Sequence, residues 1–350
     1  MKKSFIALAA LATVATAAQA QSSVTIYGVI DNGITRASNA GSSALSNTGL
    51  TNGGLSTPRF GFKGSEDLGG GLKAGFLLEG ELLTDTGSQL KPGATPDNKL
   101  FSRSSFVSLA KDGIGSMQLG FMNHTDYNMA AKYDAFGGNN IGGWIASNKG
   151  TVQLDVNTRI ENAVQLQTTS LNGLVFTYQH SFGEVAGDAT KSRQMSYGAE
   201  YTSGPFSAAY TLTKVNSSSS VTTTRNSLYG MYDFKFVDLR LGYADIETDG
   251  TAGKKKGYFI GAKVPVTHNI GLIAQYNSFD NDADKKPSTY ALGATYAFSK
   301  RTTAYLIGAK SQQDNGSSQK IVSDSKFYGF DSSVADKNST AYTVGIRHTF

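Results

Sequence analysis

Strict alternation of apolar and polar side chains is the feature that most constrains this chain. From about Arg159 to the end, one short segment after another repeats with a period of two. In residues 174–179, for example, Leu174, Phe176 and Tyr178 share one face, and the intervening residues share the other. This is the period of a β-strand, because successive side chains of an extended backbone point to opposite faces. The sequence therefore predicts an all-β chain.

The connections between the predicted strands alternate in length. Short turns such as 203–205 and 299–301 separate one pair of strands, and long polar segments such as 215–224 and 311–337 separate the next. A transmembrane barrel has this asymmetry, with short periplasmic turns and long external loops. The candidates add up to about sixteen strands of about ten residues, the length that a tilted membrane strand needs. We therefore expect a closed antiparallel transmembrane β-barrel.

A soluble β-sandwich or propeller would show the same alternation. Alternation alone does not separate the two classes, since a sandwich also has one buried face and one wet face. A helical membrane span is excluded, because no later segment approaches about 18 consecutive apolar residues. The loop lengths and the two ends of the chain favour the membrane barrel.

The first residues have the pattern of an export signal. Two lysines precede an apolar stretch that runs to about Ala18, and small residues then occupy the cleavage-determining positions. We expect residues 1–20 to be a signal peptide that is cleaved between Ala20 and Gln21, and residues 21–350 to form a single barrel domain. The alternative, a short membrane anchor, is disfavoured because the apolar run is short and Ala-rich.

Composition excludes several other classes of protein. The chain has no cysteine, so it has no disulfide framework, thiolate zinc site or cysteine nucleophile. Its four histidines lack the spacing of metal ligands, and no serine-nucleophile motif is present. A formal net charge of +5 without a sustained basic run does not indicate nucleic-acid binding. We expect no cofactor, no metal and no enzymatic activity.

The end of the chain is a further alternating segment with a terminal aromatic residue. It resembles the signature that the outer-membrane barrel assembly machinery reads. The residues that share its apolar face are Tyr342, Val344, Ile346, His348 and Phe350. An ordinary edge strand that stops at Phe350 is the alternative.

At more specific positions the sequence resembles the Gram-negative general porins of β-proteobacterial type, and the resemblance covers the whole mature chain. The motifs that carry it are residues 23–31, 59–74, 101–103, 159 with 162, 299–302 and 347–350. Membership implies a sixteen-stranded barrel, usually a trimer, whose third external loop folds into the lumen as a constriction. The position along the chain places that loop at about 124–157.

The resemblance also implies which charges line the constriction. It carries over Arg59, Arg103 and Arg159 as a basic wall, and the outward parity of the neighbouring phenylalanines adds Lys63. Asp126 and Asp134 of the loop are the expected acidic side. Rim or subunit-interface charges are the alternative for each basic residue.

One departure concerns the fifth strand. Many relatives have Gly-Arg-Gln after it, where this chain has Gly120, Phe121 and Met122, so an arginine of the wall is missing.

Together these features predict a general diffusion porin of the bacterial outer membrane. It would pass small hydrophilic solutes and ions through a water-filled channel with a mild preference for anions. The expected partners are outer-membrane lipid and lipopolysaccharide, two further copies in a homotrimer, and the barrel assembly machinery. A channel selective for an organic acid, a sugar or phosphate remains the alternative, and so does a plugged structural barrel.

Overall fold

The computed structural model describes residues 23–40, 45–89, 99–138, 140–147, 158–251, 253–281, 284–322 and 334–350. Two short helices, α2 (Thr125–Tyr133) and α3 (Trp144–Ser147), follow β6. The strands are β1 (Ser23–Ala40), β2 (Leu45–Asn52), β3 (Arg59–Gly69), β4 (Leu72–Glu81), β5 (Ser104–Lys111), β6 (Gly115–Asn123), β7 (Arg159–Thr168), β8 (Leu174–Ser181), β9 (Gln194–Ser203), β10 (Phe206–Asn216), β11 (Thr222–Asp233), β12 (Asp238–Thr248), β13 (Lys255–Pro265), β14 (Ile270–Asp280), β15 (Ser288–Ala297), β16 (Thr302–Gln312) and β17 (Ser339–Thr349).

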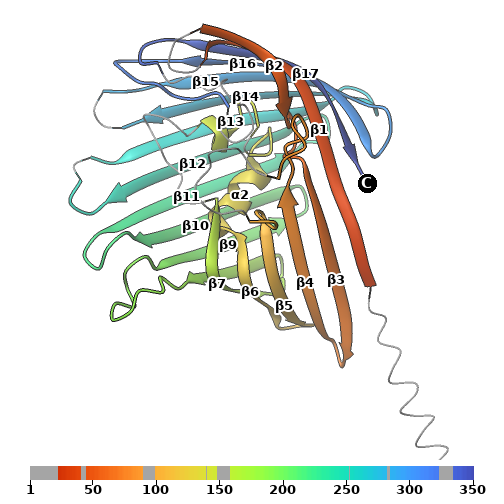
Figure 1. Ribbon diagram of the computed structural model, residues 1–350, viewed down its shortest axis with the longest axis vertical. Helices are drawn as coiled ribbons and strands as arrows, with labels where there is room; N and C mark the ends of the chain where they lie inside the picture. Colours follow the sequence, from red (N-terminus) through yellow and green to blue (C-terminus); the bar gives the residue numbers. More distant parts are fainter. Residues whose placement is uncertain are drawn as a thin grey trace, which may run out of the picture.

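The strands form one closed antiparallel barrel. Each strand from β3 to β17 pairs with the next, and β17 pairs with β1 from Ala341↔Ala37 to Thr349↔Val29. Phe350 extends this closure, because its backbone N–H donates to the carbonyl of Gly28 and its carbonyl accepts from the N–H of Gly28. The strands lie side by side around the molecule, and α2 lies within the outline that they enclose (Figure 1). The predicted barrel is confirmed.

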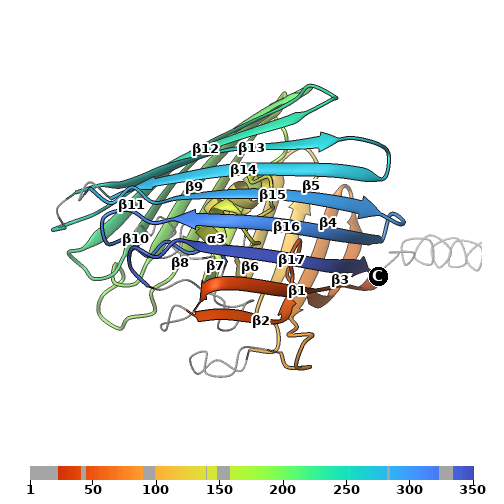
Figure 2. The same ribbon diagram turned by 90° about the horizontal axis from the view of Figure 1, so that it is seen from above.

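Strands β2 and β3 share one position in the barrel, which therefore has sixteen positions. Residues 32–40 of β1 pair with β2, beginning at Asn32↔Asn52. Residues 23–29 of β1 pair with β3, ending at Val29↔Arg59. β1, β2 and β17 run next to one another in the view from above (Figure 2). Strand β2 was not predicted, because its polar, glycine-containing sequence shows no apolar face.

Burial in the strands is the reverse of that in a soluble protein. Large apolar side chains are exposed on the outer face, among them Leu228, Leu241, Leu292, Leu306 and Val344. Their neighbours on the inner face are polar and buried, such as Ser227, Asn277 and Thr343. The exposed apolar side chains can contact lipid. The backbone N–H and C=O groups form hydrogen bonds between neighbouring strands, so a closed sheet can cross a membrane.

The connections between strands differ in length at the two ends of the barrel. Residues 70–71, 112–114, 204–205 and 266–269 make short turns at the end that holds Ser23 and Phe350. The opposite end carries the longer connections, including 82–103, 124–158 and 313–338. Among the described residues, no helix has the length and apolarity to cross a bilayer. The signal peptide and its cleavage position at Ala20 and Gln21 lie outside the described residues.

Candidate functional site

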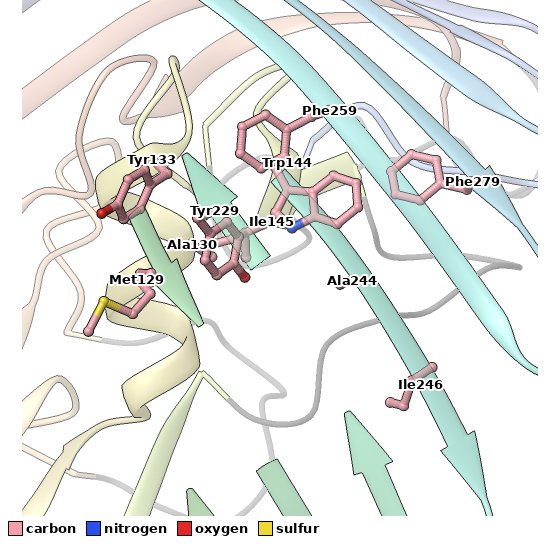
Figure 3. Packing of buried hydrophobic residues seen from close by; sticks show 11 residues of the cluster. Met129, Ala130, Tyr133, Trp144, Ile145, Tyr229, Ala244, Ile246, Phe259 and Phe279 are labelled. Carbon is pink, nitrogen blue, oxygen red and sulfur yellow. The ribbon is translucent and has the colours of Figure 1, made fainter. Parts of the chain in front are cut away.

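The connection after β6 lies against the inner face of one side of the barrel. Helix α2 contacts β9, β10, β11 and β12, and its Tyr133 ring stacks on Tyr229 of β11 with centroids 5.7 Å apart. The Tyr133 hydroxyl is 2.5 Å from that of Ser207 and donates to Glu200 at 2.9 Å. Tyr133 and Tyr229 belong to one buried apolar cluster on the inner wall (Figure 3). The segment therefore occupies part of the lumen.

The only tryptophan fixes the second half of this segment. The Trp144 ring is fully buried and stacks on Phe279 with centroids 5.2 Å apart, and Phe259 lies at 5.3 Å (Figure 3). Gly142 precedes it with a φ of +70°, and a Cβ there would lie 2.2 Å from that of Ala291. A glycine is required by both the backbone angle and the close approach to the wall.

Asp126 is buried between α2 and the wall. Its carboxylate accepts from the Thr211 hydroxyl at 2.6 Å and the Tyr229 hydroxyl at 3.2 Å, and it pairs with the Arg225 guanidinium at 3.2 Å. Burial alone would raise the pKa of Asp126, but the charge of Arg225 and the hydrogen bonds hold that pKa below its usual range. The pair links α2 to β10 and β11.

The residue before the helix completes this network. His124 caps α2, and its Nδ1 accepts from the N–H of Asp126 at 3.3 Å, which requires a neutral ring with the proton on Nε2. Burial lowers the pKa of His124 to about 4, Asp126 opposes that shift, and Arg225 adds to it. The charge balance around Asp126 therefore depends on an uncharged histidine.

Asp134 ends the same helix and organises the turn that follows. Its carboxylate accepts from the N–H groups of Phe136 at 2.8 Å, Gly138 at 3.0 Å and Trp144 at 2.7 Å. Burial raises the pKa of Asp134 to about 6, against the lowering effect of these hydrogen bonds. Asp126 and Asp134 are 2% and 0% exposed, so neither presents a charge to a solute. The expectation that they form an acidic face of the channel is corrected: they hold the loop.

The acidic groups beside the predicted arginines come from β4 instead. Arg103 donates its Nε to Glu79 at 2.6 Å, and its Nη1 lies 3.5 Å from Glu81. Arg59 pairs with Glu79 at 3.8 Å, and the Tyr27 hydroxyl donates to the other oxygen of Glu79 at 2.8 Å. Neither glutamate is among the residues predicted from the sequence, although their spacing by two residues is a usable signal of a shared face.

Arg159 joins the other two arginines through the backbone, since its Nε donates to the carbonyl of Arg103 at 3.1 Å. Strict alternation along β7 would place Ile160 on the outer face with Val164 and Leu166, and would turn Arg159 inward. Ile160 does not face lipid: it is 2% exposed and packs with Met122 and Ala163. A register shift between Gly120 and Met122 interrupts the alternation opposite it. Bulges of this kind change which face a residue occupies.

Two other predicted positions behave differently from the arginines. Lys63 is exposed, with its ammonium 5.4 Å from the centre of the Tyr27 ring. At Phe121, where the family resemblance implies an arginine, the ring lies 5.2 Å from the ammonium of Lys99, which also pairs with Glu161 at 2.5 Å. A cation is therefore present beside Phe121, and it comes from the connection between β4 and β5.

The break between β2 and β3 was not predicted from the sequence, and it is held by a buried carboxylate. Asp31, which is fully buried, accepts from the N–H groups of Gly54, Leu55 and Ser56 at 2.7–3.2 Å. The Tyr305 hydroxyl donates to the same carboxylate at 2.6 Å. Asn140 of the inner loop donates to the carbonyl of Leu55 at 2.8 Å. The wall therefore turns inward here to meet the loop.

The final strand has the alternation that its sequence predicts. Tyr342, Val344, Ile346 and Phe350 are between 51% and 59% exposed, on the outer face with His348. Their role as an assembly signal stays a prediction.

Comparison with known proteins agrees with this architecture. A family model described as Gram-negative porin matches residues 7–316. An outer membrane porin protein of Bordetella pertussis is 30% identical, and outer membrane porin protein 32 of Delftia acidovorans is 33% identical, each over 100% of both chains. The solved structure of an anion-selective porin from Comamonas acidovorans is 29% identical, with a TM-score of 0.79 over 94% of this chain and 100% of that one. This chain belongs to the Gram-negative porin family.

Proposed function

We propose that Arg59, Arg103 and Arg159 select for anions where the inner loop narrows the channel. As a porin, the protein is an outer-membrane channel for small hydrophilic solutes and ions, and not an enzyme. The observation that carries the proposal is the charge balance of this cluster. Three guanidiniums gather around only two carboxylates, Glu79 and Glu81.

The arrangement suits selection by charge for two reasons. Glu79 accepts from Arg103 and Tyr27, so the carboxylates hold the guanidiniums in place and neutralise only part of their charge. Arg59 keeps 26% of its side chain exposed, whereas Arg103 keeps 5%, so Arg59 offers the accessible charge and Arg103 supports it. Charged groups beside a narrow aqueous path raise the local concentration of counter-ions.

The test is the reversal potential of a planar bilayer under a salt gradient. Arg59→Ala and Arg103→Ala should each shift the permeability ratio towards cations, with open steps of conductance retained. Lys235→Ala is the matched control, because Lys235 lies in a short turn at the other end and is 83% exposed. Unchanged selectivity in both arginine variants would refute the assignment while leaving the channel intact.

We also propose a homotrimer that associates with lipopolysaccharide and is assembled by the barrel assembly machinery. A solved structure related in fold, OmpT of Vibrio cholerae, is described in a trimer form. The aromatic C-terminal strand, ending at Phe350, supports recognition by the assembly machinery. Cross-linking in intact outer membranes tests the trimer, and deletion of Phe350 should lower the amount of folded barrel.

A further inference from the structure

Arg347 lies on the inner face of the last strand, β17. It shares that face with Thr343, which is 1% exposed, whereas Ile346 between them points outward. Its side chain is half-buried, and its partner in register on β1 is Asp31. The C-terminal motif, residues 347–350, therefore places an arginine on the wall of the lumen.

The inward turn between β2 and β3, residues 53–58, lies beside this arginine. The Leu55 carbonyl of the turn accepts a hydrogen bond from the inner loop at 2.8 Å. The Ser56 hydroxyl accepts from Nη1 of Arg347 at 3.2 Å. Arg347 is therefore tied to the turn at the level where the inner loop meets the wall.

Arg59 reaches the same turn from the other side. Its Nε donates to the carbonyl of Thr57 at 3.1 Å, one residue after the serine that Arg347 contacts. Strands β3 and β17 lie on either side of β1 (Figure 2). Arg59 is opposite Val29 and Arg347 is opposite Asp31. Strand spacing and rise then put the two Cα atoms about 12 Å apart, and both guanidiniums approach adjacent residues of one short segment.

The guanidinium of Arg347 is only partly satisfied. Within the described part of the chain, its single hydrogen bond is the one to the uncharged Ser56 hydroxyl. Its Nε is enclosed and donates to no described group. Asp31, opposite it in register, makes no ion pair with it, because the Asp31 oxygens accept from the N–H groups of the turn and from Tyr305. A buried N–H without an acceptor is unfavourable, so the edge formed by Nε and Nη2 is open to an acceptor.

This state is unusual among the arginines of the inner wall. Four of them each pair with a carboxylate: Arg59, Arg103, Arg225 and Arg240. Arg159 belongs to the cluster already described. Arg347 instead has a serine hydroxyl beside it, and that hydroxyl keeps its own proton for a further acceptor. A guanidinium edge and a hydroxyl together are the donors that an oxyanion uses.

We propose that Arg347 and Ser56, with Arg59 on the other side of the turn, form a subsite that binds oxyanions in the constriction. Carboxylates, phosphate and sulfate present two oxygens to the edge formed by Nε and Nη2, and chloride offers no such match. The subsite rests on the proposed anion preference, because anions have to enter the constriction to reach it. The excess of charge then favours anions over cations, and Arg347 favours oxyanions over chloride.

The experiment measures single-channel current in potassium chloride while inorganic phosphate is added. Phosphate should reduce the chloride current of wild type, because it occupies the subsite. Arg347→Gln should raise the half-blocking phosphate concentration about tenfold, and Arg347→Lys, which keeps the charge without the fork, about threefold. Arg301→Gln is the matched control, because Arg301 is exposed in the turn before β16 and faces no inward turn. Its block by phosphate should equal that of wild type.

Ser56→Ala provides a second route, because it leaves the last strand unchanged. It removes the hydroxyl that holds Arg347 and should raise the half-blocking concentration about threefold. Equal block in wild type and Arg347→Gln, or an equal loss in Arg301→Gln, would overturn the proposal. If the Arg347 variants do not insert as channels, unchanged block in Ser56→Ala would overturn it.

The reversal potential in potassium chloride alone tests the proposed function separately. A shift towards cations in Arg59→Ala, with equal phosphate block in wild type and Arg347→Gln, would refute the subsite and leave the anion preference standing. Unchanged selectivity in Arg59→Ala and Arg103→Ala, with phosphate block lost in Arg347→Gln, would refute the proposed arginine cluster and support the subsite.

Discussion

The two sides of the lumen use buried charge in opposite ways. On the side of β9 to β12, Asp126 meets a single guanidinium, Arg225, and two hydroxyl donors. On the side of β3 to β7, three guanidiniums meet two carboxylates. Charge is balanced where a loop has to be held in place, and positive charge is in excess on the side that we propose attracts anions.

The two sides of the lumen should also differ in how substitutions affect the free energy of unfolding. A buried ion pair contributes little net stability, because desolvation offsets the attraction, but removing one partner leaves a costly unpaired charge. The balanced side is therefore sensitive to single substitutions in stability. The side with excess charge should respond mainly in selectivity, since its arginines lie beside an aqueous path.

Arg225→Met should have the largest effect on this comparison. It leaves the Asp126 carboxylate buried without its cation, at a cost of about 3–5 kcal/mol, and should release α2 from the wall. We expect a lower thermal unfolding temperature and larger, noisier single-channel conductance.

The double variant Arg225→Met and Asp126→Asn separates the effect of charge from that of packing. It removes the unpaired carboxylate charge and should recover much of the stability lost in Arg225→Met alone. If Arg225→Met alone leaves both stability and conductance unchanged, the pair does not anchor the loop.

Local patterns were enough to predict the barrel. Alternation identified the strands from Arg159 onwards, because it depends on a backbone conformation that a short segment determines. Periodicity failed where the alternation is interrupted, as at Ile160, and where a strand has no apolar face, as in β2.

The partners of the charged residues could not be predicted in the same way. Asp126 looked like a channel-lining acid because it lies in the loop, but its partner Arg225 lies on a strand far along the sequence. Only the closed barrel brings them together. The family resemblance supplied the arginines, whereas the pairing of Glu79 with Arg103 and the hydrogen bond from Tyr305 to Asp31 became visible only in the closed barrel.

Asp31→Asn should have the second-largest effect, at the place where the wall meets the loop. The carboxylate accepts from three backbone N–H groups and from Tyr305, and an amide cannot accept them all. We expect a loss of about 2–3 kcal/mol in unfolding experiments. Tyr305→Phe removes one of these bonds and should cost about 1 kcal/mol. Equal stability of Asp31→Asn and wild type would mean that the inward turn does not depend on the hydrogen bonds of the Asp31 carboxylate.

Acid should weaken the balanced side through His124. The pKa of His124 is about 4 in the folded state, below the ordinary histidine value of 6.5, so the released loop binds the proton more readily. Stability is therefore full above pH 6.5 and is lost as the pH falls towards 4, by about 2 kcal/mol at pH 5. Asp134, with a pKa raised to about 6, titrates in the opposite sense, so wild type alone is not a sufficient readout.

The measurement is the difference between wild type and His124→Asn in conductance and unfolding from pH 7 to 4. Asparagine also caps helices but does not titrate. The difference should grow below pH 6.5 and level off near pH 4. A difference that does not change with pH would show that protonation of His124 has no part in holding the loop.

The smallest effect should come from Lys63→Ala, which sharpens the comparison on the side with excess charge. Lys63 shares the inner face of β3 with Arg59, but it is exposed towards the short-turn end, where water and salt screen its charge. An exposed charge of this kind contributes about 0–1 kcal/mol, so the permeability ratio should change less than in Arg59→Ala. The reversal potential at low and high salt measures both variants, and the effect of Lys63 should disappear first as salt rises. If Lys63→Ala shifts selectivity as much as Arg59→Ala does, the preference comes from the field of the whole wall, and the cluster around Glu79 is not its source.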